Sequence, residues 1–528
     1  MYIYRYLIAC VVIMALTLLS QVHIIQLNSY NLDQQLLWYK KNKVSFVMNL
    51  VMLISAILYY ELHFIPAYFV VIISIFGLLI ENLPRKQKKK LVYTKRVIRL
   101  IFLCSVFFIL TLIPALVYKN EFGLKYAMYG LALSPLIVFI AYLILLPIEN
   151  GFRRNFMNEA KNIIDRNTDL YTIGITGSFG KTSVKHYVDR LLKIKYSTCM
   201  TPESFNTAMG ATLTIKNELR NINEIFVCEM GARRVSDIKE ICNIVSPYGC
   251  IITDVGNMHL DTFKTIDNVL KTKFELVDSM SHKDIIIDKW GEGIILLNGD
   301  NGLIREEAES YNFTNKKVYF YGLNPDNDFY AANISGGSDG TTFYFKSTIN
   351  DFDEIKIKTR LLGNYNVVNL VAAISYALLL KVRKEDIIKE VENIETVAHR
   401  LQLLSYDKDN LIIDDAYNSN PKGARNAIDV LKTFDGYKKI IITPGMVELN
   451  DKQDLENEDF AKYAGEVVDY AIVVGHTNKI PLKNGFEKSM TDEKVICIDK
   501  VEDAISFVRE SIEGKKVILL ENDLSDNY

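Results

Sequence analysis

A glycine-rich segment with a lysine and several hydroxyl side chains has the clearest chemical use in the sequence. Residues Gly174 to Ser183 read GITGSFGKTS, between an apolar, strand-like stretch (Tyr171 to Ile175) and a helix-like stretch that begins at Lys181. Such a loop turns backbone N–H groups toward a phosphate, and the helix N-terminus and the lysine add positive charge. The predicted nucleotide contacts are Gly177, Ser178, Phe179, Gly180, Lys181, Thr182 and Ser183. The hydroxyl of Thr182 is placed to bind Mg²⁺.

Further polar side chains follow two predicted strands of the same region. Glu229 comes directly after the strand-like run Ile225 to Cys228, and a second run, Cys250 to Thr253, precedes His259. Because ligands collect at the carboxyl ends of parallel strands, a carboxylate there can complete a Mg²⁺ shell beside a phosphate loop. We therefore predict Glu229 as a metal ligand. A single histidine or lysine is usually an ordinary polar side chain, so the residues alone leave the roles of His259 and Lys273 open.

The first part of the chain has the composition of a membrane domain. Of the 528 residues, those up to about Pro147 are dominated by Leu, Ile, Val, Phe and Tyr. Most of the apolar runs approach the roughly 20 residues that span a bilayer. The runs are Tyr6 to Ser20, Val44 to Tyr60, Phe64 to Ile80, Leu100 to Tyr118 and Ala127 to Pro147. We predict a multi-pass membrane domain of about five helices over residues 1–150; a cleaved signal peptide is the alternative for the first run.

Charges between the apolar runs predict the orientation of this domain. With five spans, Lys40, Lys41 and Lys43 share one side with the basic cluster Arg85 to Lys90 and with Arg153 and Arg154, whereas the opposite loops carry little positive charge. Basic residues prefer cytoplasmic loops, so the rest of the chain is predicted to lie in the cytoplasm. The formal net charge of −2 argues against a nucleic-acid partner. The seven cysteines include no CxxC pair, as in a reduced compartment.

The remainder of the chain alternates strand-like and helix-like segments, which predicts α/β domains. Within it, Ile285 to Leu361 has short strand-like runs separated by turn signals, and we expect an antiparallel β region attached to the nucleotide-binding sheet. From about Thr396 a second α/β pattern begins, with no GxGxxG motif at its start. The predicted domains are therefore a central nucleotide-binding domain over residues 151–395 and a Rossmann-like domain over residues 396–528.

Several segments in order resemble the Mur ligases, most closely the branch that adds D-alanyl-D-alanine to the peptidoglycan precursor. Besides GITGSFGKTS, in which Gly174 rather than Ile175 supplies the first glycine, they are ESFNTAMGATLT, EMGA, GNYNVVNLVAA, DDAYNSNP and PGMVEL, between Glu203 and Leu449, with the pair His259 and Lys273. The resemblance implies a P-loop Mur ligase central domain and a C-terminal Mur ligase domain. It covers about Tyr171 to Leu449.

What the family does with such residues can be stated as an expectation. The resemblance implies that ATP activates a substrate carboxylate as an acyl phosphate, which an amine then displaces to form an amide. Thr182 and Glu229 would hold one Mg²⁺, and His259 with a carbamylated Lys273 would hold or position a second. Asn366 is expected to contact adenine, and Arg400 and Asp415 to close over the phosphates. Lys181, Glu229, His259 and Lys273 are the predicted catalytic residues.

The chain departs from the family at several positions. Tyr365 stands where a histidine is usual, and His399 where a glycine precedes Arg400. Predicted membrane helices replace the domain that holds the UDP-sugar, and LLENDLSDNY lacks the usual KGS-type segment. We therefore expect a cell-envelope ligase whose substrates are an amino acid or peptide and a carboxylate acceptor held at the cell membrane.

Three alternatives remain open from the sequence. The chain could add D-alanyl-D-alanine to a soluble UDP-muramoyl tripeptide. It could elongate a poly-γ-glutamate-type polymer, since such synthetases also join a Mur-like core to membrane segments. It could also be a membrane scaffold that binds ATP without catalysis, although a scaffold does not need Lys181, Glu229 and Lys273 together.

Overall fold

A computed structural model describes residues 2–28, 30–41, 43–81, 90–118, 121–258, 260–281, 289–311, 313, 316–337, 339–349, 352–405, 409–416, 420–447, 449 and 452–523. The chain forms two compact units, Met1–Asn155 and Phe156–Tyr528. Each unit has its own buried apolar core, so each can be understood by itself.

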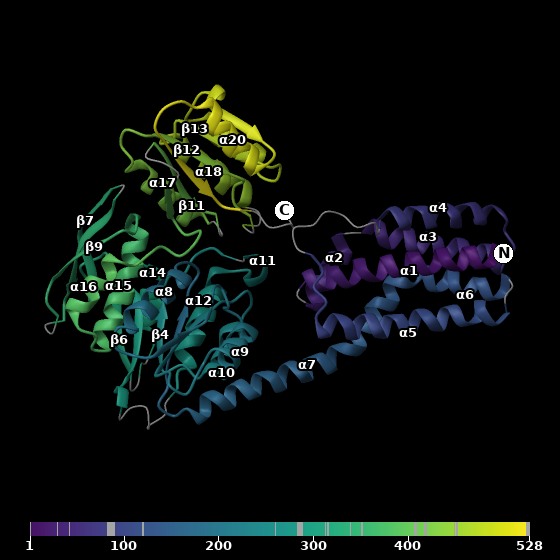
Figure 1. The fold of residues 1–528 in the computed structure, drawn as a ribbon, viewed down its shortest axis with the longest axis horizontal. Coiled ribbons are helices and arrows are strands. Elements are labelled where there is room, and N and C mark those ends of the chain that lie inside the picture. The colour runs from purple at the N-terminus through teal and green to yellow at the C-terminus, as the bar shows by residue number, and fades with distance from the viewer. Residues whose placement is uncertain are drawn as a thin grey trace. The chain divides into compact units, whose positions relative to one another are not determined.

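The first unit consists of α-helices (Figure 1). They are α1 (Tyr2–Leu27), α2 (Leu32–Lys41), α3 (Lys43–Tyr60), α4 (Pro66–Glu81), α5 (Lys95–Tyr118), α6 (Glu121–Ala132) and α7 (Ser134–Arg166), which continues into the second unit. By length and composition, three described segments could cross a membrane: Leu7–Leu27, Lys95–Tyr118 and Ser134–Arg166. Two shorter apolar helical segments are Val47–Tyr60 and Phe69–Ile80. All five predicted apolar runs are thus mainly helical in their described parts; the third run becomes helical at Pro66.

The fifth apolar run is not one regular helix, as a single span over Ala127 to Pro147 would require. It is divided at Leu133 between α6 and α7. Pro135 has no N–H to donate one turn back, so the regular hydrogen-bond ladder is interrupted there. The two helices stay joined because the Leu133 N–H donates to Tyr129 O and the Ile137 N–H donates to Leu133 O, both at 2.9 Å.

The distribution of side chains in this unit suits an apolar surrounding: apolar side chains are exposed and charged ones are paired. Large apolar side chains point outward, as at Phe102 and Ile73, which are 70% and 69% exposed. Charged groups are paired instead: Arg99 of α5 donates two hydrogen bonds, of 2.6 and 2.8 Å, to the carboxylate of Glu149 in α7. Exposed apolar surface of this extent is unusual for a protein surface in water.

The second unit is built on two sheets, the larger of which has nine strands in the order β2-β3-β1-β4-β5-β6-β7-β8-β9. Its strands are β1 (Tyr171–Thr176), β2 (Thr198–Met200), β3 (Ile225–Met230), β4 (Gly249–Ile252), β5 (Gly293–Asn298), β6 (Lys316–Gly322), β7 (Phe329–Gly337), β8 (Gly340–Ser347) and β9 (Ile355–Thr359). Neighbours from β2 to β7 are parallel, and β7, β8 and β9 pair antiparallel. In the register, Thr176 lies between Met230 and Ile252, so β1, β3 and β4 end at one edge.

The predicted antiparallel region is correct only from β7 onward. The strands β5 and β6, which fall within Ile285 to Leu361, extend the parallel sheet instead. The cause is the helix α14 (Gly302–Glu309) between them, which is long enough for a parallel crossover. The Asn301 side chain caps this helix by accepting a hydrogen bond from the Ile304 N–H at 3.2 Å.

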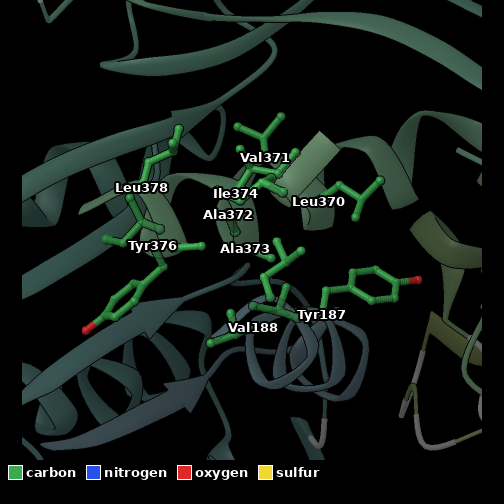
Figure 2. Packing of buried hydrophobic residues seen from close by; sticks show 14 of the residues in the cluster. Tyr187, Val188, Leu370, Val371, Ala372, Ala373, Ile374, Tyr376 and Leu378 are labelled. Carbon is green, nitrogen blue, oxygen red and sulfur yellow. The ribbon is translucent and has the colours of Figure 1, made fainter. Parts of the chain in front are cut away.

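Helices lie against the nine-stranded sheet (Figure 1). They bury its apolar side chains. They are α8 (Lys181–Leu192), α9 (Ala208–Asn217), α10 (Asp237–Val245), α11 (Leu260–Phe263), α12 (Ile266–Asp278), α14, α15 (Gly363–Leu379) and α16 (Lys384–Glu392). Figure 2 shows Tyr187 and Val188 of α8 beside apolar side chains of α15. Ala372 and Ala373 of α15 are fully buried, and their small side chains allow this close packing. The helix that follows the phosphate loop is therefore held by the core.

The smaller sheet has six strands in the order β10-β11-β15-β12-β13-β14. Its elements are β10 (Gln402–Ser405), β11 (Asn410–Asp415), α17 (Pro421–Lys432), β12 (Lys438–Thr443), α18 (Gln453–Gly465), β13 (Tyr470–Val474), α19 (Lys479–Glu487), β14 (Val495–Ile498), α20 (Val501–Ser511) and β15 (Lys516–Glu521). Among the described strands of this sheet, only β10 is antiparallel to its neighbour. The sequence predicts the other strands from the apolar runs Leu411 to Asp414, Lys439 to Thr443, Ala471 to Val474, Val495 to Ile498 and Val517 to Leu520. It does not predict β10, because four residues at a sheet edge give too short a pattern.

Candidate active site

The loop between β1 and α8 has the conformation that its glycines permit. Gly177 and Gly180 have φ angles of 152° and 80°. A Cβ at Gly177 would lie 2.1 Å from Thr253 Oγ1, and one at Gly180 would lie 2.7 Å from Asn369 Oδ1. Side chains are therefore excluded at both positions by conformation and by space.

The lysine of this loop donates hydrogen bonds to backbone carbonyls of the loop itself. Lys181 Nζ donates to Gly177 O at 2.7 Å and to Ser178 O at 3.1 Å. The end of β4 supports the loop, since the Ser178 N–H donates to Asp254 O at 2.6 Å and Thr253 Oγ1 donates to Phe179 O. Burial lowers the pKa of Lys181 to about 8, an effect that nearby Glu229 opposes and Arg400 reinforces. The sequence-predicted loop thus places a lysine and a helix N-terminus around one point.

Glu229, at the carboxyl end of β3, lies directly beside Thr182. Thr182 Oγ1 donates to Glu229 Oε1 at 3.2 Å, and Asn206 Nδ2 donates to the same oxygen at 3.2 Å. Glu229 Oε2 forms an ion pair with Lys185 Nζ at 3.1 Å, but the angles are not those of a hydrogen bond. Among the described residues, this buried oxygen therefore has no hydrogen-bond donor. A buried carboxylate oxygen with spare acceptor capacity beside a hydroxyl fits a Mg²⁺ ligand pair. Mg²⁺ keeps waters and phosphate oxygens as its other ligands.

Lys185 is a site residue that the sequence reasoning missed. It is fully buried in α8, one turn after Lys181, and forms the ion pair with Glu229. Its Nζ also donates to Glu203 O. The spacing of four residues from Lys181 places both lysines on one face of the helix, which is the signal that could have identified Lys185.

Lys273, in α12, opens onto the same cavity as the phosphate loop. The cavity has a volume of about 410 Å³, and its lining includes Lys181, Glu229, Arg233 and Lys273. Burial, and then the charge of Lys181, lower the pKa of Lys273 to about 7. A large fraction of this amine is therefore neutral near pH 7, which is the form that reacts with CO₂. His259 lies outside the described residues, and within the described part no three His, Cys, Asp or Glu side chains cluster as a metal site.

The predicted nucleotide contacts from the rest of the chain line the same cavity: Asn366, Arg400 and Asp415. Asn366 is held on both sides, because its Nδ2 donates to Leu362 O at 3.0 Å and its Oδ1 accepts from Tyr187 OH at 3.2 Å. Asn369, one turn later, is buried beside Gly180, and its Nδ2 has no partner in the described structure. An unsatisfied amide donor at the phosphate loop was not predicted from the sequence.

The C-terminal sheet contributes Asp415 and a direct contact to the central sheet. Burial raises the pKa of Asp415 to about 6, although Arg400 and the hydrogen bond from the Leu401 N–H oppose the rise. Lys422 Nζ of α17 lies 2.7 Å from Asp254 Oδ2, at the end of β4.

A second cavity, of about 800 Å³, lies between α8 and the linker 393–400, and Thr182 and Arg400 line both cavities. The fold and the site together define a P-loop α/β protein whose cavity is lined by residues of both α/β domains.

Comparison with known proteins shows the family. Residues 175–377 match the Mur ligase middle domain, and residues 399–521 match the Mur ligase, glutamate ligase domain. The chain belongs to the Mur ligase family and is an ATP-dependent carbon–nitrogen ligase.

Relatives with similar sequences include UDP-N-acetylmuramoyl-tripeptide–D-alanyl-D-alanine ligases. The Bacillus subtilis protein is 27% identical over 353 residues, which are 66% of this chain and 72% of that protein. The Escherichia coli protein is 25% identical over 333 residues, which are 61% of this chain and 69% of that protein.

Two solved structures share the fold. MurF from Acinetobacter baumannii has a TM-score of 0.61 and 23% identity, with 70% of this chain and 77% of that chain covered. MurF ligase from Thermotoga maritima in complex with ADP has a TM-score of 0.59 and 24% identity, with 70% and 80% covered. Identity this low establishes the fold alone.

Proposed function

We propose that this ligase joins an amino acid or peptide to a carboxylate acceptor of cell-envelope synthesis, and that the acceptor is held at a membrane. The observation that carries the reaction is the single cavity that contains Lys181, Thr182, Glu229 and Lys273. These groups are arranged for transfer of a phosphoryl group to a carboxylate, which gives an acyl phosphate that an amine attacks. Lys181 and the loop N–H groups supply fixed positive charge where oxygens gain negative charge.

The other residues of the cavity have matching roles in this proposal. Thr182 and Glu229 would hold Mg²⁺, which would neutralise phosphate charge when bound. Lys273, with its lowered pKa, would carry the carbamate that gives a lysine a ligand character beside a cation. Arg233 lines the cavity and is exposed, and in the described structure its guanidinium has no partner, so it can bind the carboxylate of an acceptor. Arg400 and Asp415 would close over the phosphates and keep water from the acyl phosphate.

The membrane-held acceptor is supported by the helical unit that precedes the ligase domains. Residues up to Asn155 form a unit with large exposed apolar side chains, whereas the match to the Mur ligase domains begins at residue 175. The related proteins favour a second candidate, the addition of D-alanyl-D-alanine to a soluble UDP-muramoyl tripeptide. The two candidates share the chemistry and differ in the acceptor.

Phosphate release by the full chain in lipid nanodiscs separates these functions. We expect ATP hydrolysis that depends on both an amine and a lipid-linked acceptor from a bacterial envelope extract, with at least a hundredfold loss in Lys181→Ala. Lys193→Ala is the matched control, because that lysine lies just after α8 and is half-exposed. Efficient ligation to the soluble UDP-muramoyl tripeptide would refute the membrane-held acceptor. Elongation of glutamate would indicate the polymer synthetase, and ATP binding without acceptor-dependent release would indicate a scaffold.

A further inference from the structure

The linker between the two α/β domains has an unusual backbone on both sides of Arg400. His399 and Leu401 have φ angles of 59° and 48°, in the left-handed region that residues other than glycine seldom adopt. A side chain makes this conformation unfavourable, and it persists only where surrounding contacts impose it.

Two consecutive carboxylates at the end of β11 provide these contacts. His399 Nδ1 lies 2.7 Å from Asp414 Oδ2, and the Leu401 N–H donates to Asp415 Oδ1 at 3.2 Å. Asp414 is buried and is itself fixed, because its Oδ1 accepts a hydrogen bond from the Ala416 N–H at 3.1 Å. Both residues that flank Arg400 are therefore tied to one strand end of the C-terminal sheet.

Arg400 is the residue that this conformation presents to the site. It lines both the cavity of the phosphate loop and the second cavity beside α8. Its charge lowers the pKa of Lys181, in the same direction as burial, and lowers that of Asp415, against the larger effect of burial. A long arginine side chain on a free linker would lose much conformational freedom when it meets a phosphate, and a fixed backbone reduces this loss.

We propose that His399 and Asp414 are positioning residues: their pair holds the linker in its left-handed conformation and so directs Arg400 toward the nucleotide phosphates. The inference rests on the proposed function in one respect, the contact of Arg400 with the nucleotide. His399 itself acts through Arg400. The two carboxylates contact different parts of the linker. Asp414 contacts the side chain of His399, whereas Asp415 accepts a hydrogen bond from the backbone N–H of Leu401.

A double-mutant cycle on the full chain tests the proposal through nucleotide binding, without an acceptor. Equilibrium binding of a fluorescent ATP analogue is measured for wild type, His399→Gly, Arg400→Ala and the double variant. Glycine accepts the backbone conformation but removes the link to Asp414, so we expect His399→Gly to weaken binding about tenfold. In the Arg400→Ala background the same change should weaken binding less than twofold, because the group that it positions is already gone.

Further variants separate the loss of the link to Asp414 from changes in backbone conformation or folding. His399→Asn tolerates the left-handed backbone and keeps a donor toward Asp414, so it should bind within about threefold of wild type. Its thermal unfolding and that of His399→Gly should match wild type, and if His399→Gly unfolds early, Asp414→Asn replaces it in the cycle. Equal losses in the two Arg400 backgrounds, or unchanged binding by His399→Gly, would overturn the proposal. If the wild type binds the nucleotide but releases no phosphate with any acceptor, only the proposed function is overturned.

Discussion

At the scale of single residues, the site depends on charges that are kept away from water. Burial lowers the pKa of Lys181 and Lys273 and raises that of Asp415, so each of these groups has a larger neutral fraction near pH 7 than it would have in water. Lys185 stays beside Glu229, where an unpaired buried carboxylate would be costly. The protonation of the groups that line the cavity is therefore set by their surroundings.

Lys273→Ala is expected to abolish turnover at the residue scale, because alanine cannot carry a carbamate. Acetate or propionate at tens of millimolar should restore part of the activity by placing a carboxylate in the vacated space. Acceptor-dependent phosphate release measures both effects. Lys271→Ala, on the exposed side of the same helix, is the control. Full activity of Lys273→Ala without an added acid would rule out the carbamate.

Asp415→Asn is expected to stabilise the protein at pH 7 while lowering its activity. An aspartate has a pKa of about 3.9 when unfolded, and in the fold Asp415 titrates at about 6. Between these values the folded state binds more protons, so this carboxyl lowers the stability as the pH rises from about 4 to 6. Asparagine does not titrate and still accepts from the Leu401 N–H.

Thermal unfolding at two pH values measures this effect. With a difference of about two pKa units between the folded and unfolded states, the gain should be about 3 kcal/mol at pH 7. It should fall to about 1 kcal/mol near pH 4.5, where folded Asp415 is protonated but the unfolded chain is still mostly ionised. The exposed Asp435→Asn serves as a control that should change little. A gain that is equal at both pH values would contradict the assignment of the titration to Asp415.

At the scale of elements, the site is made where the phosphate loop, the end of β3 and α17 meet. Parallel pairing brings Thr176 level with Met230, which sets Glu229 beside Thr182. From the other sheet, Lys422 of α17 reaches Asp254 at the end of β4. The contact holds α17 against the strand end whose backbone supports the loop.

Lys422→Ala should loosen this contact between the two domains. We expect the KM for ATP to rise about two- to fivefold with kcat nearly unchanged, as the loss of a partly exposed ion pair implies. The melting temperature should fall by no more than about 2 °C, because Asp254 keeps its hydrogen bonds from Asn301 and from the Val255 N–H.

The matched control is Lys432→Ala on the same helix. Lys432 contacts Asp429 and Tyr463, which both belong to the C-terminal domain, so its removal should leave the KM for ATP unchanged. Steady-state kinetics with saturating acceptor compares the two variants. The same KM in Lys422→Ala as in wild type would show that the ion pair does not hold the domains together.

At the scale of the whole molecule, an apolar helical unit and an ATP-dependent ligase unit are parts of one chain. The proposed location is a cell membrane, with the ligase domains in the cytoplasm. The Glu61 to His63 turn and residues near Val92 would then lie on opposite sides.

Labelling of single cysteines in intact cells tests this topology. Leu62 and Val92 are 68% and 61% exposed, so a cysteine at either position is accessible to a reagent. A membrane-impermeant thiol reagent should modify Leu62→Cys and should modify Val92→Cys only after the cells are permeabilised. Labelling of Val92→Cys in intact cells would reverse the predicted orientation, and release of the protein by an alkaline wash would refute membrane insertion.

The sequence by itself determined the parts that depend on local patterns. The glycines and lysine of the phosphate loop, the strand that carries Glu229 and most strands of the C-terminal sheet can be predicted because a loop motif or a short periodicity specifies them within a few residues. Family membership was also evident, since ordered motifs from Gly174 to Leu449 carry it.

Only the tertiary structure decided which residues distant in the sequence contact one another. The parallel pairing of β5 and β6, the ion pair of Lys185 with Glu229 and the link of His399 to Asp414 depend on sheet register and on packing across many residues. Local periodicity does not encode these contacts. The structure is therefore needed to show which lysine meets the carboxylate and which backbone presents Arg400.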